Sequence, residues 1–196
     1  MLLDDVRDWW IKRQARRLRA TAIDRVADGA RVKVVGRVDV GARPLEAPIS
    51  GRPCAAWSLE VQEGNGFTTV AIEVRAQDFV VRDPSPRSAL VRVKPASVVF
   101  ETDVAIWQKT MTPRMRAFLD RHKLPEGGFY GSPYYRYVEG VLEAGEEITV
   151  VGNARLEIDE SGSTASYREP PMRVVLEEAQ RAPLYVLDGP ARWRLG

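Results

Sequence analysis

The sequence predicts a mainly β protein, built as an antiparallel, partly open barrel or sandwich with an N-terminal helix and a helical insertion. Short runs of alternating apolar and polar residues recur along most of the chain, which is the pattern of half-buried strands. Turn-forming residues separate these runs at short intervals. Long helical patterns do not alternate with the runs, so a parallel α/β sheet is not expected.

The composition is that of a globular protein. At 196 residues, 44% hydrophobic and 29% charged, the chain is long enough for one domain with its own core. A formal net charge of +2 is too small to predict nucleic-acid binding by the chain as a whole. The chain has a single cysteine, no apolar run of the ~18 residues that cross a membrane, and no signal-peptide pattern. We therefore expect a cytoplasmic protein, free or peripheral on the inner face of the membrane.

Residues 1–24 predict a basic amphipathic helix. Its first half carries apolar side chains on one face, and a basic cluster follows; the face consists of Leu2, Leu3, Val6, Trp9 and Trp10. The helix can dock on its own domain, or on a second copy to form a homo-oligomer. It can instead contact a membrane–water interface, where indole rings and cations both settle. The expected contact residues are Trp9, Trp10, Lys12, Arg13, Arg16 and Arg17. A nucleic-acid contact has the least support.

Residues 25–188 predict the β domain, and residues 189–196 a C-terminal tail. Strands are expected at 31–40, 54–62, 67–74, 79–81, 89–93, 138–142, 147–158, 172–176 and 183–187. Gly36 interrupts the first run and indicates a bulge or a sharp bend. Gly64-Asn65-Gly66 predicts a hairpin between the second and third runs. Trp57 is expected to be buried in a central strand.

Residues 101–142 predict an insertion that interrupts the sheet. A short helix is expected over 113–122, with Thr112 as N-cap and Pro113 in the first turn. A Gly- and Pro-rich stretch follows that contains Tyr130, Tyr134, Tyr135 and Tyr137. These tyrosines predict either packing of the insertion onto the barrel or an exposed surface for a partner or ligand.

No group of residues predicts catalysis, a cofactor or a metal. His122, the only histidine, is expected to be solvated at the end of the helix. Cys54 is expected to be a buried, unreactive thiol. One cysteine and one histidine cannot form a structural zinc site. Carboxylates gather in a segment where we expect a solvated turn, at Glu139, Glu143, Glu146 and Glu147. We therefore predict that the protein is not an enzyme.

Three segments, in order, resemble a known family. The first is 34–38 followed by 45–57, the second is 79–83, and the third is 137–152. Together they resemble the GIDE domain, also called the "beside a membrane" domain, of mulan-type mitochondrial E3 ubiquitin ligases and of bacterial proteins. The resemblance covers residues 25–188 and implies a domain that engages partners or substrates near membranes.

Ligase activity does not follow from this resemblance. Catalysis in those ligases belongs to a RING that binds two zinc ions, and this sequence lacks the cysteines for it. It also lacks their transmembrane helices, and Asp83-Pro84-Ser85-Pro86 stands where the family often has Asp, a small residue and Gly. The resemblance implies a non-catalytic module that recognises a protein partner at the cytoplasmic membrane face. The alternative is a small-molecule or lipid sensor with a pocket in the β domain. An oligonucleotide-binding barrel is a weaker third hypothesis.

Overall fold

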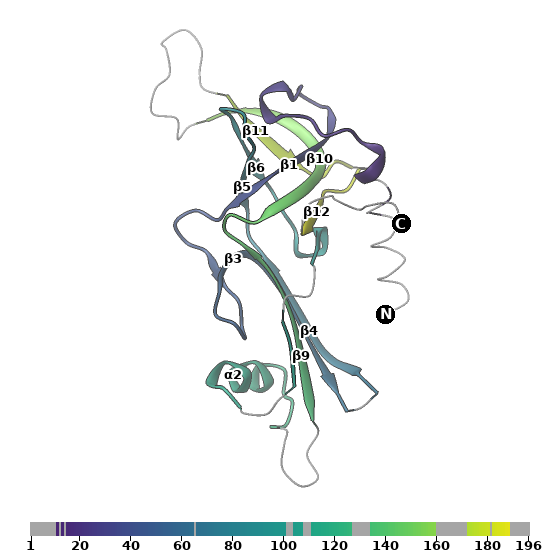
Figure 1. Ribbon diagram of the computed structural model, residues 1–196, viewed down its shortest axis with the longest axis vertical. Coiled ribbons are helices and arrows are strands. Elements are labelled where there is room, and N and C mark those ends of the chain that lie inside the picture. Colours follow the sequence, from purple (N-terminus) through teal and green to yellow (C-terminus); the bar gives the residue numbers. More distant parts are fainter. Residues whose placement is uncertain are drawn as a thin grey trace.

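The computed structural model describes residues 11, 13, 15–64, 66–100, 104–107, 111–126, 134–159, 172–180 and 182–188. It has two parts, a closed barrel and a long open sheet (Figure 1). The elements are η1 (Ile23–Arg25), β1 (Arg31–Asp39), β2 (Leu45–Glu46), β3 (Pro53–Glu63), β4 (Thr68–Ala76), β5 (Phe79–Arg82), β6 (Ser88–Val91), η2 (Pro95–Ser97), β7 (Val98–Val99), β8 (Val104–Trp107), α2 (Pro113–Arg121), β9 (Tyr135–Glu143), β10 (Glu147–Ile158), β11 (Met172–Glu177) and β12 (Tyr185–Asp188).

Strands β1, β5, β6, β11 and β10 close the barrel. β1 pairs with β10 over residues 31–37 and with β5 over residues 37–39. It therefore joins these two strands and closes the ring. All pairs around the barrel are antiparallel except β6 with β11, which is parallel. The mainly β class with a barrel is thus confirmed, and the barrel is mixed and closed. β12 pairs with β10 outside this ring, and β7 pairs with β12.

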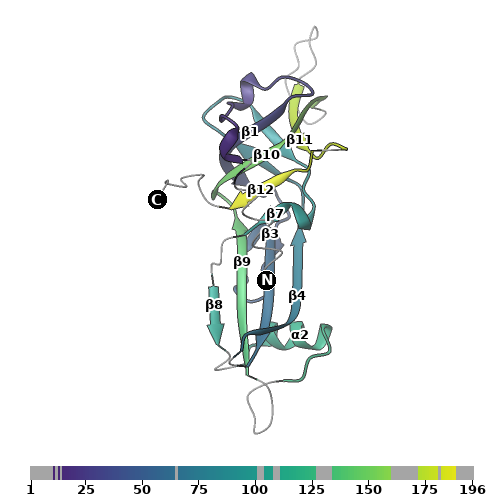
Figure 2. The same cartoon turned by 90° about the vertical axis from the view of Figure 1, so that its right-hand side faces the viewer.

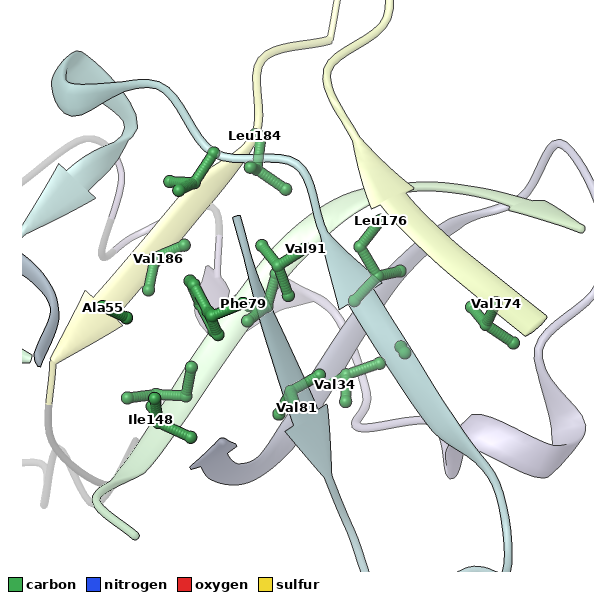
Figure 3. Packing of buried hydrophobic residues seen from close by; sticks show 14 of the residues in the cluster. Val34, Ala55, Phe79, Val81, Val91, Ile148, Val174, Leu176, Leu184 and Val186 are labelled. Carbon is green, nitrogen blue, oxygen red and sulfur yellow. The ribbon is translucent and has the colours of Figure 1, made fainter. Parts of the chain in front are cut away.

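The barrel is filled by aliphatic side chains, with Phe79 among them (Figure 3). Alternate residues of β1, Val32, Val34 and Val38, point into this core and are buried. Alternation of this kind is the sequence signal from which the strand was predicted. The residues labelled in Figure 3 come from strands on every side of the barrel and from the start of β3.

The second part is a sheet in the order β4-β3-β9-β8, with β2 beside β3 at the barrel end. Its long strands extend away from the barrel (Figure 2). Residues 101–142, expected to interrupt the sheet, also contribute strands: β8, which was not predicted, and most of β9, where a strand was expected at 138–142. The hairpin predicted at residues 64–66 joins β3 to β4, with Gly64 at φ 67°.

Helix α2 covers one face of this sheet. The Thr112 hydroxyl accepts a hydrogen bond from the Met115 backbone N–H at 3.2 Å, so the predicted N-cap is confirmed. Phe118 and Leu119 on the inner side of α2 are buried against Trp57 of β3. Trp57 is 4% exposed and lies in a central strand, as predicted.

Candidate functional site

The sheet has a second face that α2 does not cover; among the described elements, η2 contacts β4 of this sheet. Pairing across the strands places Ser58, Glu60 and Gln62 of β3 on this side, opposite to the buried Leu59 and Val61. We call it the open face. It carries the exposed side chains Phe67, Ile72 and Trp107, which are 45%, 60% and 42% exposed. Most large apolar residues of the described chain lie in the core, so this cluster is a candidate contact surface.

Two aromatic rings and one arginine form the end of the open face that is far from the barrel. The Phe67 and Trp107 ring centroids are 5.7 Å apart and tilted by 47°. The Arg136 guanidinium lies 5.1 Å from the centre of the Phe67 ring, within cation–π range. Phe67 has a φ of 52°, a left-handed conformation that is unfavourable for a bulky residue. Such strain at an exposed aromatic residue is a pointer to function.

A row of polar side chains crosses the open face next to these rings. Arg136 donates to the Gln62 Oε1 at 3.1 Å, and Gln62 donates to the Glu60 Oε1 at 2.9 Å. Thr69 donates to the same Glu60 oxygen. The row therefore holds one carboxylate and one guanidinium, and its charges balance.

The four predicted tyrosines do not form one surface. Tyr135 and Tyr137 are 1% exposed and belong to the core between α2 and the sheet, so they are not available to a partner. Burial, with a further contribution from Tyr135, raises the pKa of Tyr137 to about 12. Tyr134 is 60% exposed, while Tyr130 lies outside the described residues. Tyr135 and Tyr137 therefore pack in a core, but against α2 and the open sheet and not onto the barrel as that alternative had it.

The exposed aromatic residues of the described chain include Tyr134, which the sequence reasoning named, and Phe67 and Trp107, which it missed. Phe67 follows a Gly-rich turn, and an aromatic residue at a hairpin tip has no core to enter. Trp107 ends the short apolar run 104–107. Both signals were present in the sequence, but neither indicates the partner strand that brings the two rings together.

The N-terminal segment docks on the barrel. Residues 11, 13 and 15–17 are helical, as predicted, and Ile11 and Ala15 are buried against Val99 and Tyr185. Arg13, Arg16 and Arg17 are exposed. Trp9, Trp10 and Lys12 lie outside the described residues. Within the described part of the chain, no helix has the length and apolar character needed to cross a membrane.

Glu139 was expected in a solvated turn, and this is wrong. It is fully buried, and its carboxylate accepts the backbone N–H of Ile49 at 2.7 Å and that of Ser50 at 3.1 Å. These bonds satisfy a buried carboxylate, which would otherwise be costly. Glu139 therefore holds the loop before β3 against β9, joining the first and third segments of the GIDE resemblance.

His122 was expected to be solvated, but its side chain has two partners. Its Nε2 lies 3.0 Å from the Glu73 Oε2, and its ring packs on Phe118 at 4.4 Å between centroids. Arg121 and Arg75 pair with the same carboxylate, at 3.1 Å and 2.8 Å. Partial burial would raise the pKa of Glu73, but the hydrogen bond with His122 and the charges of Arg121 and Arg75 outweigh it and lower the pKa.

Cys54 is fully buried, as predicted. Its Sγ lies 3.7 Å from the Leu45 carbonyl oxygen, to which the thiol donates. Burial, and then the charges of Glu139 and Glu143, raise the pKa of Cys54 to about 12. A thiol in this environment is a poor nucleophile, because the thiolate is the reactive form.

A surface depression of about 700 Å³ lies where β1, β5 and β10 meet. It is open to solvent, and charged residues line it together with Val35, Gly36, Val38 and Pro84; these are Arg37, Asp39, Arg82, Asp83 and Glu147. Ligand pockets usually enclose most of a small molecule within apolar walls. This depression therefore gives the sensor hypothesis little support.

Comparison of the chain with models of protein families, with curated proteins and with solved structures finds no match. The resemblance to the GIDE domain therefore rests on the three sequence segments alone.

Proposed function

We propose that this protein is a non-catalytic, GIDE-like binding module whose open face recognises a protein partner at the cytoplasmic face of a membrane. The observation that carries the proposal is the cluster of the exposed Phe67 and Trp107 with the half-buried Arg136, on a sheet whose other face packs against α2. Tryptophan and arginine are the residue types that contribute most to protein–protein affinity. Phe67, one ring of this cluster, is exposed and has a left-handed backbone.

The balance of charge on the open face favours a protein over a nucleic acid. Single strands bind to surfaces that combine stacking aromatic residues with an excess of cations. On the open face, Arg136 is offset by Glu60, which occupies the centre of the polar row. The barrel is also a poor candidate for binding a nucleic-acid strand, because bases stack on aromatic side chains. The large apolar residues exposed on its described strands are Ile158 and Met172, which are not aromatic.

The proposal is tested with the full-length protein and single substitutions. Trp107→Ala should abolish co-purification of a specific protein from native cells, because it removes the largest exposed side chain of the cluster. Ile158→Ala is the matched control, since Ile158 is 58% exposed on the barrel strand β10. Both variants should melt within a few degrees of the wild type, because exposed substitutions change stability little. Capture of RNA or DNA that depends on Trp107, or of a protein that both variants retain, would contradict the proposal.

A further inference from the structure

Strand β4 is an edge of the sheet: no described strand pairs with its outer side, although η2 contacts β4. It is nine residues long and pairs only with β3 among the described strands. None of its residues forms a backbone hydrogen bond with any other described segment. An edge of this kind presents a row of free N–H and C=O groups to which another chain can add.

The features that usually protect an edge strand are weak in β4. Such strands are commonly very short or carry proline, lysine or other charged residues; β4 has no lysine or proline, and its charged residues are Glu73 and Arg75. Its only irregularity is a bulge opposite Val61 and Gln62. Ile72, in the middle of the strand, is 60% exposed. The other edge strand, β8, has four residues.

The two sides of β4 differ in chemistry. On the open face it presents Ile72 and Val74, which pair with Glu60 and Ser58. On the side of α2 it presents Glu73 and Arg75, beside Arg121 at the end of the helix. Glu73 is 15% exposed, whereas the Arg75 and Arg121 side chains are 55% and 46% exposed. The two guanidinium groups lie over the rings of Trp57 and Phe118 and outnumber the one sheltered carboxylate, so positive charge is in excess on this side.

We infer that β4 accepts an extended segment of the protein partner, in which apolar and acidic residues alternate. This inference rests on the proposed function and names the part of the partner that binds. The segment adds to the sheet by backbone hydrogen bonds, the mode known as β-augmentation. Because side chains alternate along a strand, one set contacts Ile72 and Val74 while the other reaches Arg75 and Arg121. Charge complementarity on the second side selects carboxylates.

The test uses a short synthetic peptide in which valine and glutamate alternate, labelled for fluorescence anisotropy. We expect saturable binding to the full-length protein and slower hydrogen exchange of β4 amides in the complex. A valine–lysine peptide and a fully N-methylated valine–glutamate peptide should bind at least about tenfold more weakly, since they lose the charge match and the backbone donors. Absence of binding by the valine–glutamate peptide, or equal binding by either control peptide, would overturn the inference.

Substitutions locate the binding. Ile72→Glu and Arg75→Gln should each lower the affinity for the valine–glutamate peptide by roughly tenfold or more. Ile158→Glu, at a similarly exposed isoleucine, should leave this affinity unchanged. If the peptide does not bind but Trp107→Ala still abolishes capture of the partner, the inference fails and the proposed function stands. If the protein alone forms a dimer that Ile72→Glu dissociates, the edge belongs to a second copy and the inference is wrong.

Discussion

Gly36 closes the barrel at the point where β1 turns from β10 toward β5. A Cβ at this position would lie 2.5 Å from the carbonyl oxygen of Arg82 and 2.8 Å from the Cγ2 of Val81. The backbone of a paired strand cannot move aside as a flexible side chain can. The approach of the two strands therefore requires glycine. The break in the first alternating run predicted a bend here, but not the strand that it approaches.

Gly36→Ala should lower the free energy of unfolding by about 1–3 kcal/mol, the usual cost of forcing an extra methyl group into a packed site. Urea denaturation followed by circular dichroism measures this change. Gly66→Ala is the control, because nothing lies within 4 Å of a Cβ at Gly66, and its effect should stay within about 0.5 kcal/mol. Equal stability of the two variants would mean that β1 and β5 are farther apart than described.

Glu139 shows why part of the candidate site could not be predicted. Its partners are backbone N–H groups about ninety residues earlier in the chain, and the spacing of acidic residues carries no information about them. One local signal was available. Tyr137, Glu139 and Val141 lie on the same face of β9. Tyr137 and Val141, the neighbours of Glu139 on that face, are both buried. The periodicity indicated an inward carboxylate, although the carboxylate cluster suggested a turn.

At the scale of elements, the N-terminal helix docks through a face that the sequence pattern did not single out. At about 100° per residue, Arg13 and Arg17 fall on the same side of an ideal helix as the apolar residues of the first half. Ile11 and Ala15, one turn apart, lie on the opposite side of an ideal helix and are the ones buried on the barrel. Docking is therefore correct for the described part of the helix. The basic side chains remain at the surface, where a membrane can meet them.

The membrane location in the proposed function gives a prediction for these arginines. The protein should co-sediment with phosphatidylserine vesicles at low salt, and salt should weaken the binding. Each surface cation contributes about 1 kcal/mol, so Arg16→Glu, Arg17→Glu and Arg19→Glu together should weaken it by roughly a hundredfold or more. The same change in net charge at three other exposed positions, Arg43, Arg87 and Lys123, should have a smaller effect. If the wild type binds no vesicles at any salt concentration, the proposed membrane location is wrong.

The strands themselves were the most predictable elements. The nine predicted runs correspond to β1, β3, β4, β5, β6, β9, β10, β11 and β12, because alternating residues and short apolar runs between turn residues are local signals of a strand. The missed strands, β2, β7 and β8, have two to four residues each, too few for a periodic signal. They are strands because of the neighbours with which they pair, and those neighbours are distant in the sequence.

At the scale of the whole molecule, the barrel and the sheet share a core. Ala55 and Ala56 of β3 and Leu142 of β9 are buried with the barrel residues, and β9 continues into β10 through a tight turn at Gly145. The sequence predicted the fold class, but not that a hairpin and a later insertion would build one sheet beside the barrel. The pairing of Trp57 with Val141 is an example of the long-range contacts that local patterns cannot supply.

Ion-paired carboxylates in both parts make the stability of the whole molecule depend on pH. In the barrel, hydrogen bonds from Arg155 and Arg92 lower the pKa of Glu157 to about 2. In the sheet, the pKa of Glu73 is lowered as described above. A backbone hydrogen bond from Gly41, and then one from the Arg82 side chain, lowers the pKa of Asp39. Each carboxylate binds fewer protons in the folded than in the unfolded state, so unfolding in acid takes up protons.

The stabilisation is therefore complete above the ordinary carboxylate pKa of about 4 and is lost as the pH falls toward about 2. The urea midpoint should be constant near neutral pH and fall steeply below about pH 4. Glu157→Gln removes the barrel carboxylate whose pKa is lowered to about 2. The variant should therefore be less stable near neutral pH and lose less stability in acid. Asp24→Asn, at an exposed carboxylate for which the described residues provide no ion pair, should follow the wild-type curve. A Glu157→Gln curve parallel to that of the wild type would show that the Arg92–Glu157–Arg155 network does not persist in solution.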